Sequence, residues 1–168
     1  ALGVDSDGNV YVTGHSVGSG TEYDYATIKY TPDGDTLWVR RYSGPAINYN
    51  VDKAYALAVD SSGNVYVNGY SNCTDAICYL TIKYAPGGDT LWVRQYYETE
   101  SRYDSAGAIA VDGAGNVYVT GQSGNADYLT VKYYQCPFGY PLIQPILSKV
   151  MAEGEALSIK VSIYSNCS

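Results

Sequence analysis

Short segments in which apolar and polar residues alternate recur along most of the chain. Alternation with a period of two predicts half-buried β-strands. The clearest segments are residues 54–59, 64–70, 79–84, 90–94, 106–111 and 128–133. Gly, Pro, Asn and Asp, which favour turns, bound these segments. The sequence therefore predicts an all-β fold of short antiparallel strands.

One phrase, V-D-x-x-G-N-V-Y-V, occurs three times, starting at Val4, Val59 and Val111. The offsets between the copies are 55 and 52 residues. Repeats of this length and strand content are typical of propeller blades, and the chain enters its first blade late, at Ala1. Because a catalytic centre usually occurs once, the repetition describes a scaffold.

Two further strands complete the repeat. In the third strand of the first copy, Ala26, Ile28 and Tyr30 share one face, and Thr27 and Lys29 share the other. A turn of the type Pro-x-Gly then predicts a hairpin that leads into a fourth strand, T-L-W-V-R, in the first two copies. Four antiparallel strands make one blade.

These phrases, in this order, resemble the bacterial β-propeller repeat (SBBP) family, whose members carry V-D-x-x-G-N-V-Y-V-T-G, an I-K-Y strand and an L-W-x-R-x-Y strand. The resemblance covers about residues 1–135, divided near 1–52, 53–104 and 105–135. It implies a propeller fold on secreted or surface bacterial proteins. It implies no catalytic residues.

The third repeat departs from the pattern. After Lys132-Tyr133-Tyr134 no L-W-x-R strand follows, so two blades are predicted to be complete and one to be partial. Propellers usually have about four to eight blades, so this chain is not expected to close a ring alone. Residues 136–168 form a separate segment, and Pro137, Pro141 and Pro145 predict a connector without a central strand.

Beyond the connector, residues 156–164 alternate sharply, and one face is formed by Leu157, Ile159, Val161 and Ile163. Residues 145–165 also look like the start of an immunoglobulin-like or cadherin-like domain. An apolar strand without a partner favours aggregation unless something covers it. We expect this strand to be donated to another copy, either beside Leu2 and Val4 or at the edge after Tyr133.

The charge balance limits the partners. The 168 residues include 10 basic and 17 acidic ones, so no basic stripe is available for nucleic acid. No apolar run reaches the roughly 18 to 20 residues that span a bilayer, which predicts a soluble chain. The start at Ala1, without Met, favours a removed leader or a fragment.

The chain contains four cysteines, Cys73, Cys78, Cys136 and Cys167. Four cysteines allow three pairings, and we favour a local Cys73–Cys78 bridge with Cys136–Cys167 as the second. No C-x-x-C spacing is present, which argues against zinc.

Asn72 and Asn166 match the N-glycosylation pattern, although chance matches are as common. Together with the cysteines, they predict an extracellular or cell-surface location.

The repeated D-x-x-G-N phrase invites a calcium interpretation, because Asp5, Asp7 and Asn9 cluster in the first copy. A calcium loop of the EF-hand type has its glycine at position 6, whereas here it falls at position 4. Ser62 and Ala114 replace Asp7 in the other copies. We therefore predict a hairpin turn, with a single calcium at the first copy as the alternative.

Other polar residues give no active site. His15 has no nucleophile near it in the sequence and is interpreted as a surface or strand-end residue. Lys29, Lys83 and Lys132 occupy equivalent positions and are expected on a solvated face or paired with acids, with a ligand-binding row as the alternative.

Trp38 and Trp92 also occupy equivalent positions, which favours packing between blades over a platform for sugar rings. The carboxylates of Glu98, Glu100 and Asp104 show no spacing that pairs them for glycoside hydrolysis.

The leading hypothesis is therefore a non-enzymatic extracellular structural protein, a homopolymer that self-assembles by β-strand exchange into a filament or sheath. The alternative is a surface binding module for glycan or protein, as a fragment of a larger propeller. A third hypothesis is an enzyme built on a complete propeller. No cofactor or metal is expected.

Overall fold

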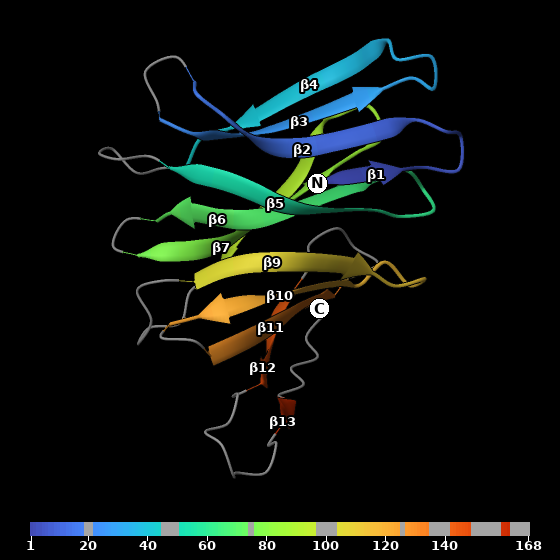
Figure 1. The fold of residues 1–168 in the computed structure, drawn as a ribbon. Helices are drawn as coiled ribbons and strands as arrows, with labels where there is room; N and C mark the ends of the chain where they lie inside the picture. Colours follow the sequence, from blue (N-terminus) through green and yellow to red (C-terminus); the bar gives the residue numbers. More distant parts are fainter. Residues whose placement is uncertain are drawn as a thin grey trace.

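The computed structural model describes residues 1–18, 22–44, 51–73, 76–96, 104–124, 127–134, 142–148 and 159–161. These residues form three antiparallel sheets stacked face against face as propeller-type blades (Figure 1). Blade 1 contains β1 (Leu2–Val4), β2 (Val10–Ser16), β3 (Asp24–Tyr30) and β4 (Thr36–Tyr42). Blade 2 contains β5 (Asp52–Val59), β6 (Val65–Asn72), β7 (Ile77–Tyr84) and β8 (Thr90–Tyr96). Blade 3 contains β9 (Asp104–Val111), β10 (Val117–Ser123), β11 (Asp127–Tyr134), β12 (Leu142–Ser148) and β13 (Ile159–Val161).

The all-β prediction and the order of strands within each repeat are confirmed. In each blade, strands that follow one another in the chain pair as antiparallel neighbours. The innermost strands β1, β5 and β9 lie closest to the neighbouring blades. As predicted, the chain enters blade 1 late, so β1 has only 3 residues where β5 and β9 have 8.

The two rims of the stack differ in their connections. One rim, here called the tight-turn rim, carries the five-residue connections 5–9, 31–35, 60–64, 85–89 and 112–116. The opposite rim, here called the variable rim, carries connections 17–23, 43–51, 73–76, 97–103 and 124–126, which differ in length and sequence. In Figure 1 the strands β3, β5, β7 and β9 start at the variable rim, on the left.

The core lies between the blades. At both junctions within the chain, a mainly aromatic face of one blade packs against a mainly aliphatic face of the next. Between blades 1 and 2, blade 1 supplies the buried residues Tyr11, Tyr25 and Trp38, and blade 2 supplies Ala54, Val65, Val67, Leu80 and Ile82 together with one aromatic residue, Tyr84. Between blades 2 and 3, Tyr66, Tyr79 and Trp92 pack against Val117, Val119, Leu129 and Val131.

The C-terminal segment adds two strands to blade 3. The third repeat supplies β9 to β11, and β12 pairs with β11 in the position of a fourth strand. The prediction that the Pro-rich stretch forms no strand inside a sheet is therefore wrong for residues 142–148. Pro145 lies opposite Val131, whereas β13 pairs only with residues 146–148 of β12. Among the described residues, Pro145 therefore has a partner on one side only, and a missing N–H costs least on an unpaired side.

This arrangement bears on the predicted strand exchange. The edge after Tyr133 is occupied by β12 of the same chain, so it is not a vacant acceptor. Ile159 and Val161 lie in β13, which pairs with β12 of the same chain, while Leu157 and Ile163 lie outside the described residues. Donation of this strand to another copy stays a prediction.

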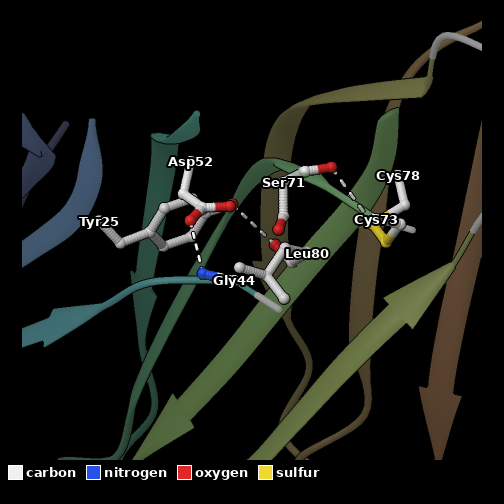
Figure 2. The surroundings of a disulfide bond; sticks show 7 residues. All are labelled: Tyr25, Gly44, Asp52, Ser71, Cys73, Cys78 and Leu80. Carbon is white, nitrogen blue, oxygen red and sulfur yellow. Dashed lines mark hydrogen bonds between the residues drawn. A yellow bond between two sulfur atoms is a disulfide. The ribbon is translucent and has the colours of Figure 1, made fainter. Parts of the chain in front are cut away.

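The structure joins Cys73 and Cys78 in a disulfide next to β6 and β7 (Figure 2). Cys136, Cys167 and Asn166 lie outside the described residues, and Asn72 is the last residue of β6. Among the residues that the structure describes, no helix is long and apolar enough to cross a membrane.

Candidate functional site

The repeated carboxylates hold the tight turns together. Asp5 Oδ1 accepts hydrogen bonds from the backbone N–H groups of Asp7 (3.0 Å) and Asn9 (2.9 Å). Its Oδ2 accepts from Asn9 Nδ2 (2.9 Å) and from the hydroxyl of Tyr11 (2.8 Å). The same network recurs around Asp60 and Asp112. The hairpin turn is therefore confirmed, and N–H and O–H donors occupy the oxygens that calcium would need.

These donors also set the charge of the turn. Burial alone would raise the pKa of Asp5 and Asp60, but the hydrogen bonds outweigh it and lower both. The glycine of each turn, such as Gly63 with φ of 77°, adopts a left-handed conformation that other residues rarely take. The phrase V-D-x-x-G-N is thus explained by structure alone.

The repeated lysines belong to the same scaffold. Lys29 and Lys83 are buried, and their ammonium groups lie 5.0 and 4.9 Å from the ring centres of Tyr11 and Tyr66. Lys29 also forms an ion pair with Asp5 at 3.9 Å. Pairing with an acid, one of the two predicted settings, is therefore confirmed for Lys29. Lys83 is buried and not on a solvated face, whereas Lys132 in blade 3 is partly exposed.

The predicted packing of the tryptophans between blades is confirmed. Trp38 lies between Tyr11 and Tyr84, with ring centres 6.1 and 5.9 Å away, and its Nε1 donates to the carbonyl oxygen of Pro86 at 3.0 Å. Trp92 packs in the same way between blades 2 and 3. Buried rings of this kind cannot serve as a platform for sugars.

Functional residues are therefore sought among side chains that do not repeat. Five of them gather at the variable rim where blades 1 and 2 meet, and we call them the rim cluster: His15, Tyr23, Lys53, Tyr55 and Tyr70. They come from the end of β2, the residue before β3, the start of β5 and the end of β6.

Side-chain contacts and strand pairing link the rim cluster. His15 meets Tyr23 edge to face at 5.2 Å, and the Lys53 ammonium lies 4.7 Å from the ring centre of Tyr23. Tyr55 and Tyr70 lie 5.7 Å apart, and Lys53 faces Tyr70 across the strand pair. Tyr23 and Tyr55 keep 37% and 43% of their surface exposed. The cluster therefore presents open aromatic faces, hydroxyls and one cation.

The backbone holds the cluster across the blade junction. The N–H of Asp52 donates to the carbonyl oxygen of Tyr23 at 2.7 Å, and Tyr23 forms a parallel bridge with Val51. These bonds fix Tyr23, from blade 1, beside the start of β5 in blade 2. Burial raises the pKa of Tyr55 and Tyr70, so both hydroxyls stay protonated at neutral pH and can donate hydrogen bonds.

Among the described residues, the rim cluster occurs once. At the junction of blades 2 and 3, Ser105 replaces Lys53, Gly107 replaces Tyr55 and Gln122 replaces Tyr70. The sequence indicated that this rim varies between blades, because the position of His15 is occupied by Tyr70 and Gln122 in the other repeats. It did not reveal which residues meet at the junction, because these lie on four separate strands or connections.

Two buried acids lie at the same rim. Asp24 Oδ2 pairs with the guanidinium of Arg41 at 3.2 Å, and Asp52 Oδ2 accepts from the backbone N–H of Gly44 at 2.6 Å (Figure 2). Burial raises the pKa of Asp52 and the charge of Asp24 adds to this, while Ser71 and Gly44 lower it less. Oδ1 of Asp52 has no hydrogen-bond partner within the described ranges.

We expect Asp52→Asn to raise the free energy of unfolding at pH 7. A raised pKa means that the folded protein favours the protonated carboxyl of Asp52. Its contribution to stability is complete below pH 3.8, the usual pKa of an aspartate, and is lost as the pH rises through the higher pKa of the folded state. Asparagine resembles that protonated form, so the advantage of the variant should vanish below about pH 3.8. Urea denaturation at pH 7 and pH 3 measures this.

Asp60→Asn is the matched control for this substitution. The pKa of Asp60 is lowered, so the fold favours its charged form and the substitution should destabilise the protein at pH 7. A loss of stability in Asp52→Asn as well would contradict the role assigned to Asp52.

The site offers little for catalysis. No group of three or more His, Cys, Asp or Glu side chains that could hold a metal ion occurs in the described part of the chain. Asp104 is buried and accepts a hydrogen bond from Ser123 Oγ at 2.7 Å, while Glu98 and Glu100 lie outside the described residues. His15 is exposed at the end of β2, as expected for a strand-end histidine.

Comparison with known proteins gives a family-model match and similar solved structures. A family model described as Beta-propeller repeat matches residues 37–75 and 91–128. No curated protein matches the chain. The structure of a fucose lectin from Kordia zhangzhouensis in complex with methyl-fucoside matches with a TM-score of 0.44 and 13% identity, covering 85% of this chain and 95% of that one. A likeness at this level identifies no ligand for this chain.

Proposed function

Because the Beta-propeller repeat family model matches residues 37–75 and 91–128, we propose that the blades form a non-enzymatic binding module with its ligand site at the rim cluster. One observation carries this proposal. In the part of the chain that the structure describes, the cluster is a group of exposed aromatic residues that occurs once, on the rim whose connections vary. The tryptophans, the turn aspartates and the lysines, by contrast, repeat as scaffold. Variable connections on a rigid scaffold are where proteins most often place binding residues.

A carbohydrate is the ligand class that fits this chemistry best. A sugar ring has an apolar C–H face and a hydroxylated edge, and a tyrosine offers a matching flat ring with a polar tip. Tyr23 and Tyr55 supply exposed rings, and the Lys53 ammonium supplies a donor for sugar hydroxyls or for a carboxylate. The net charge of −7 disfavours nucleic acid, whose phosphates are also negative.

An extracytoplasmic location accords with this function. The Cys73–Cys78 disulfide lies at the same rim and is stable in oxidising compartments. A binding module with this bond is suited to the cell surface or the medium, where glycans are presented.

The test is a glycan array with the purified chain, followed by calorimetry on the sugars that bind. We expect Tyr55→Ala and Tyr23→Ala each to weaken binding by about tenfold or more, which corresponds to about 1.4 kcal/mol. Gln122→Ala, at the position of Tyr70 in blade 3, is the matched control and should bind like the unchanged chain. Folding of each variant is checked by thermal unfolding.

Two outcomes would overturn the proposal. One is an array without any bound glycan. The other is a glycan whose affinity is the same in both tyrosine variants, because its site would then lie elsewhere on the blades.

A further inference from the structure

The outer face of blade 1 is an aliphatic face that no described residue covers. Val12 on this face is 37% exposed, whereas the equivalent Val67 and Val119 are fully buried by the preceding blade. Leu2 and Val4 are exposed as well. We call this surface the open aliphatic face.

The outer face of blade 3 is of the other kind. Tyr128 is 61% exposed, whereas the equivalent Tyr25 and Tyr79 are fully buried against the next blade. Tyr118 stands where Tyr11 and Tyr66 stand in the other blades, and the Lys132 ammonium lies 4.8 Å from its ring centre. We call this surface the open aromatic face.

At these two faces, exposure differs between equivalent positions of the blades. Leu37 and Leu91 occupy equivalent positions in β4 and β8 and are 51% and 50% exposed, although blade 2 has neighbours on both sides and blade 1 has one. A position away from the blade interfaces therefore keeps the same exposure in both blades, whereas Val12 and Tyr128 differ from their equivalents.

The interfaces within the chain show what each open face accepts. The hydroxyl of Tyr25 donates to the carbonyl oxygen of Leu80 at 3.1 Å, and that of Tyr79 to Leu129 at 3.3 Å. Lys29 Nζ reaches the carbonyl oxygen of Pro86 at 3.4 Å. The aromatic face of one blade therefore contacts both the side chains and the backbone of the next.

We propose that the open aromatic face of one copy packs onto the open aliphatic face of a second copy, head to tail, in the way that blades pack within the chain. Transferred to these faces, the internal contacts join Tyr128 to the carbonyl oxygen of Ala26 and Lys132 to that of Pro32. Two copies of three blades make six, within the roughly four to eight blades that close a ring. The assembly is then a closed dimer with two equal junctions.

This junction differs from the internal ones in one residue. Trp38 and Trp92 lie opposite Lys29 and Lys83 in the strand register, whereas Gln144 lies opposite Lys132. The junction between copies therefore lacks the tryptophan that each internal junction buries. It is expected to be weaker than the internal contacts and to dissociate without unfolding of the blades.

Sedimentation of the full chain over a range of concentrations tests the proposal. We expect a species of twice the 18.2 kDa chain mass. Val12→Glu and Tyr128→Glu should each raise the dissociation constant about a hundredfold or more, because each places an unpaired charge in the junction. Leu91→Glu adds the same charge outside the junction and should leave the dimer intact.

Mixing separates a damaged junction from a damaged fold. Each variant retains one good face, so Val12→Glu mixed with Tyr128→Glu should restore one junction and give a mixed dimer that neither variant forms alone. A chain that stays monomeric at all concentrations would overturn the proposal and leave the faces to other blades. A dimer unaffected by Val12→Glu, or a polymer instead of a dimer, would overturn it too.

Discussion

Replacing Trp38 with alanine is expected to lower the free energy of unfolding by about 3–5 kcal/mol, as for other large buried aromatic residues. The ring fills the junction of blades 1 and 2 between Tyr11 and Tyr84. Its Nε1 hydrogen bond to Pro86 and the guanidinium of Arg40, 5.8 Å from the ring centre, connect the same side chain to blade 2 and to β4. The alanine variant leaves a cavity and removes these contacts.

Trp92 is the matched comparison, because its ring packs in the same way but its Nε1 has no acceptor in the described part of the chain. Phenylalanine keeps a ring and removes the N–H. Trp38→Phe should therefore cost about 1 kcal/mol more than Trp92→Phe, the net value of one hydrogen bond. Urea denaturation of the three variants measures these differences, and equal losses in the two phenylalanine variants would contradict the role of the Pro86 contact.

The parts of the fold that repeat could be predicted from the sequence. Alternation, the D-x-x-G-N turn and the position of the tryptophans report local backbone preferences and a packing need that each blade shares. Asp5 and Trp38 therefore have the roles that their repetition indicates. In a repeat protein, the role of a residue in one blade predicts the role of the equivalent residue in the next.

The parts that depend on a single blade junction, or on a departure of one repeat from the shared sequence pattern, could not be predicted. The strand β12 contains Pro145, which argues against a strand unless the neighbour on each side is known. Lys29 and Lys83 alternate as if exposed, and only the next blade buries them. The rim cluster brings Tyr23 to Lys53, which are 30 positions apart in the sequence and share no motif.

Repetition also separates the roles of equivalent residues. A position that is buried in all blades but the first or the last identifies an end of the stack, as Val12 and Tyr128 do. A position whose residue type changes between blades, as at His15, identifies a surface that blade packing does not constrain. The first kind of residue bears on assembly and the second on ligand binding, so variants of the two kinds should affect different measurements.

A second large effect is expected from Gly69→Ala in β6. A Cβ at this position would overlap the carbonyl oxygen of Lys53, because β5 bulges between Ala54 and Ala56 toward Gly69. The obstacle is backbone in the middle of a sheet, which cannot move aside as a side chain would. We expect a loss of about 3 kcal/mol or more in the free energy of unfolding, at the upper end for overpacked sites. We expect a similar loss for Gly121→Ala, because a Cβ there would overlap the carbonyl oxygen of Ser105.

Gly14→Ala supplies the control for this prediction, because Gly14 is the equivalent glycine of blade 1. The short strand β1 pairs with residues 10–12 of β2, and Ala1 exchanges backbone hydrogen bonds with Thr13. No bulge of the kind seen in β5 lies opposite Gly14, and nothing lies within 4 Å of a Cβ there. The substitution should therefore change stability by no more than about 0.5 kcal/mol. Urea denaturation of the three alanine variants compares them directly. Similar losses at all three positions would mean that glycine is required by backbone conformation in β2, β6 and β10, and not by the approach of the innermost strand.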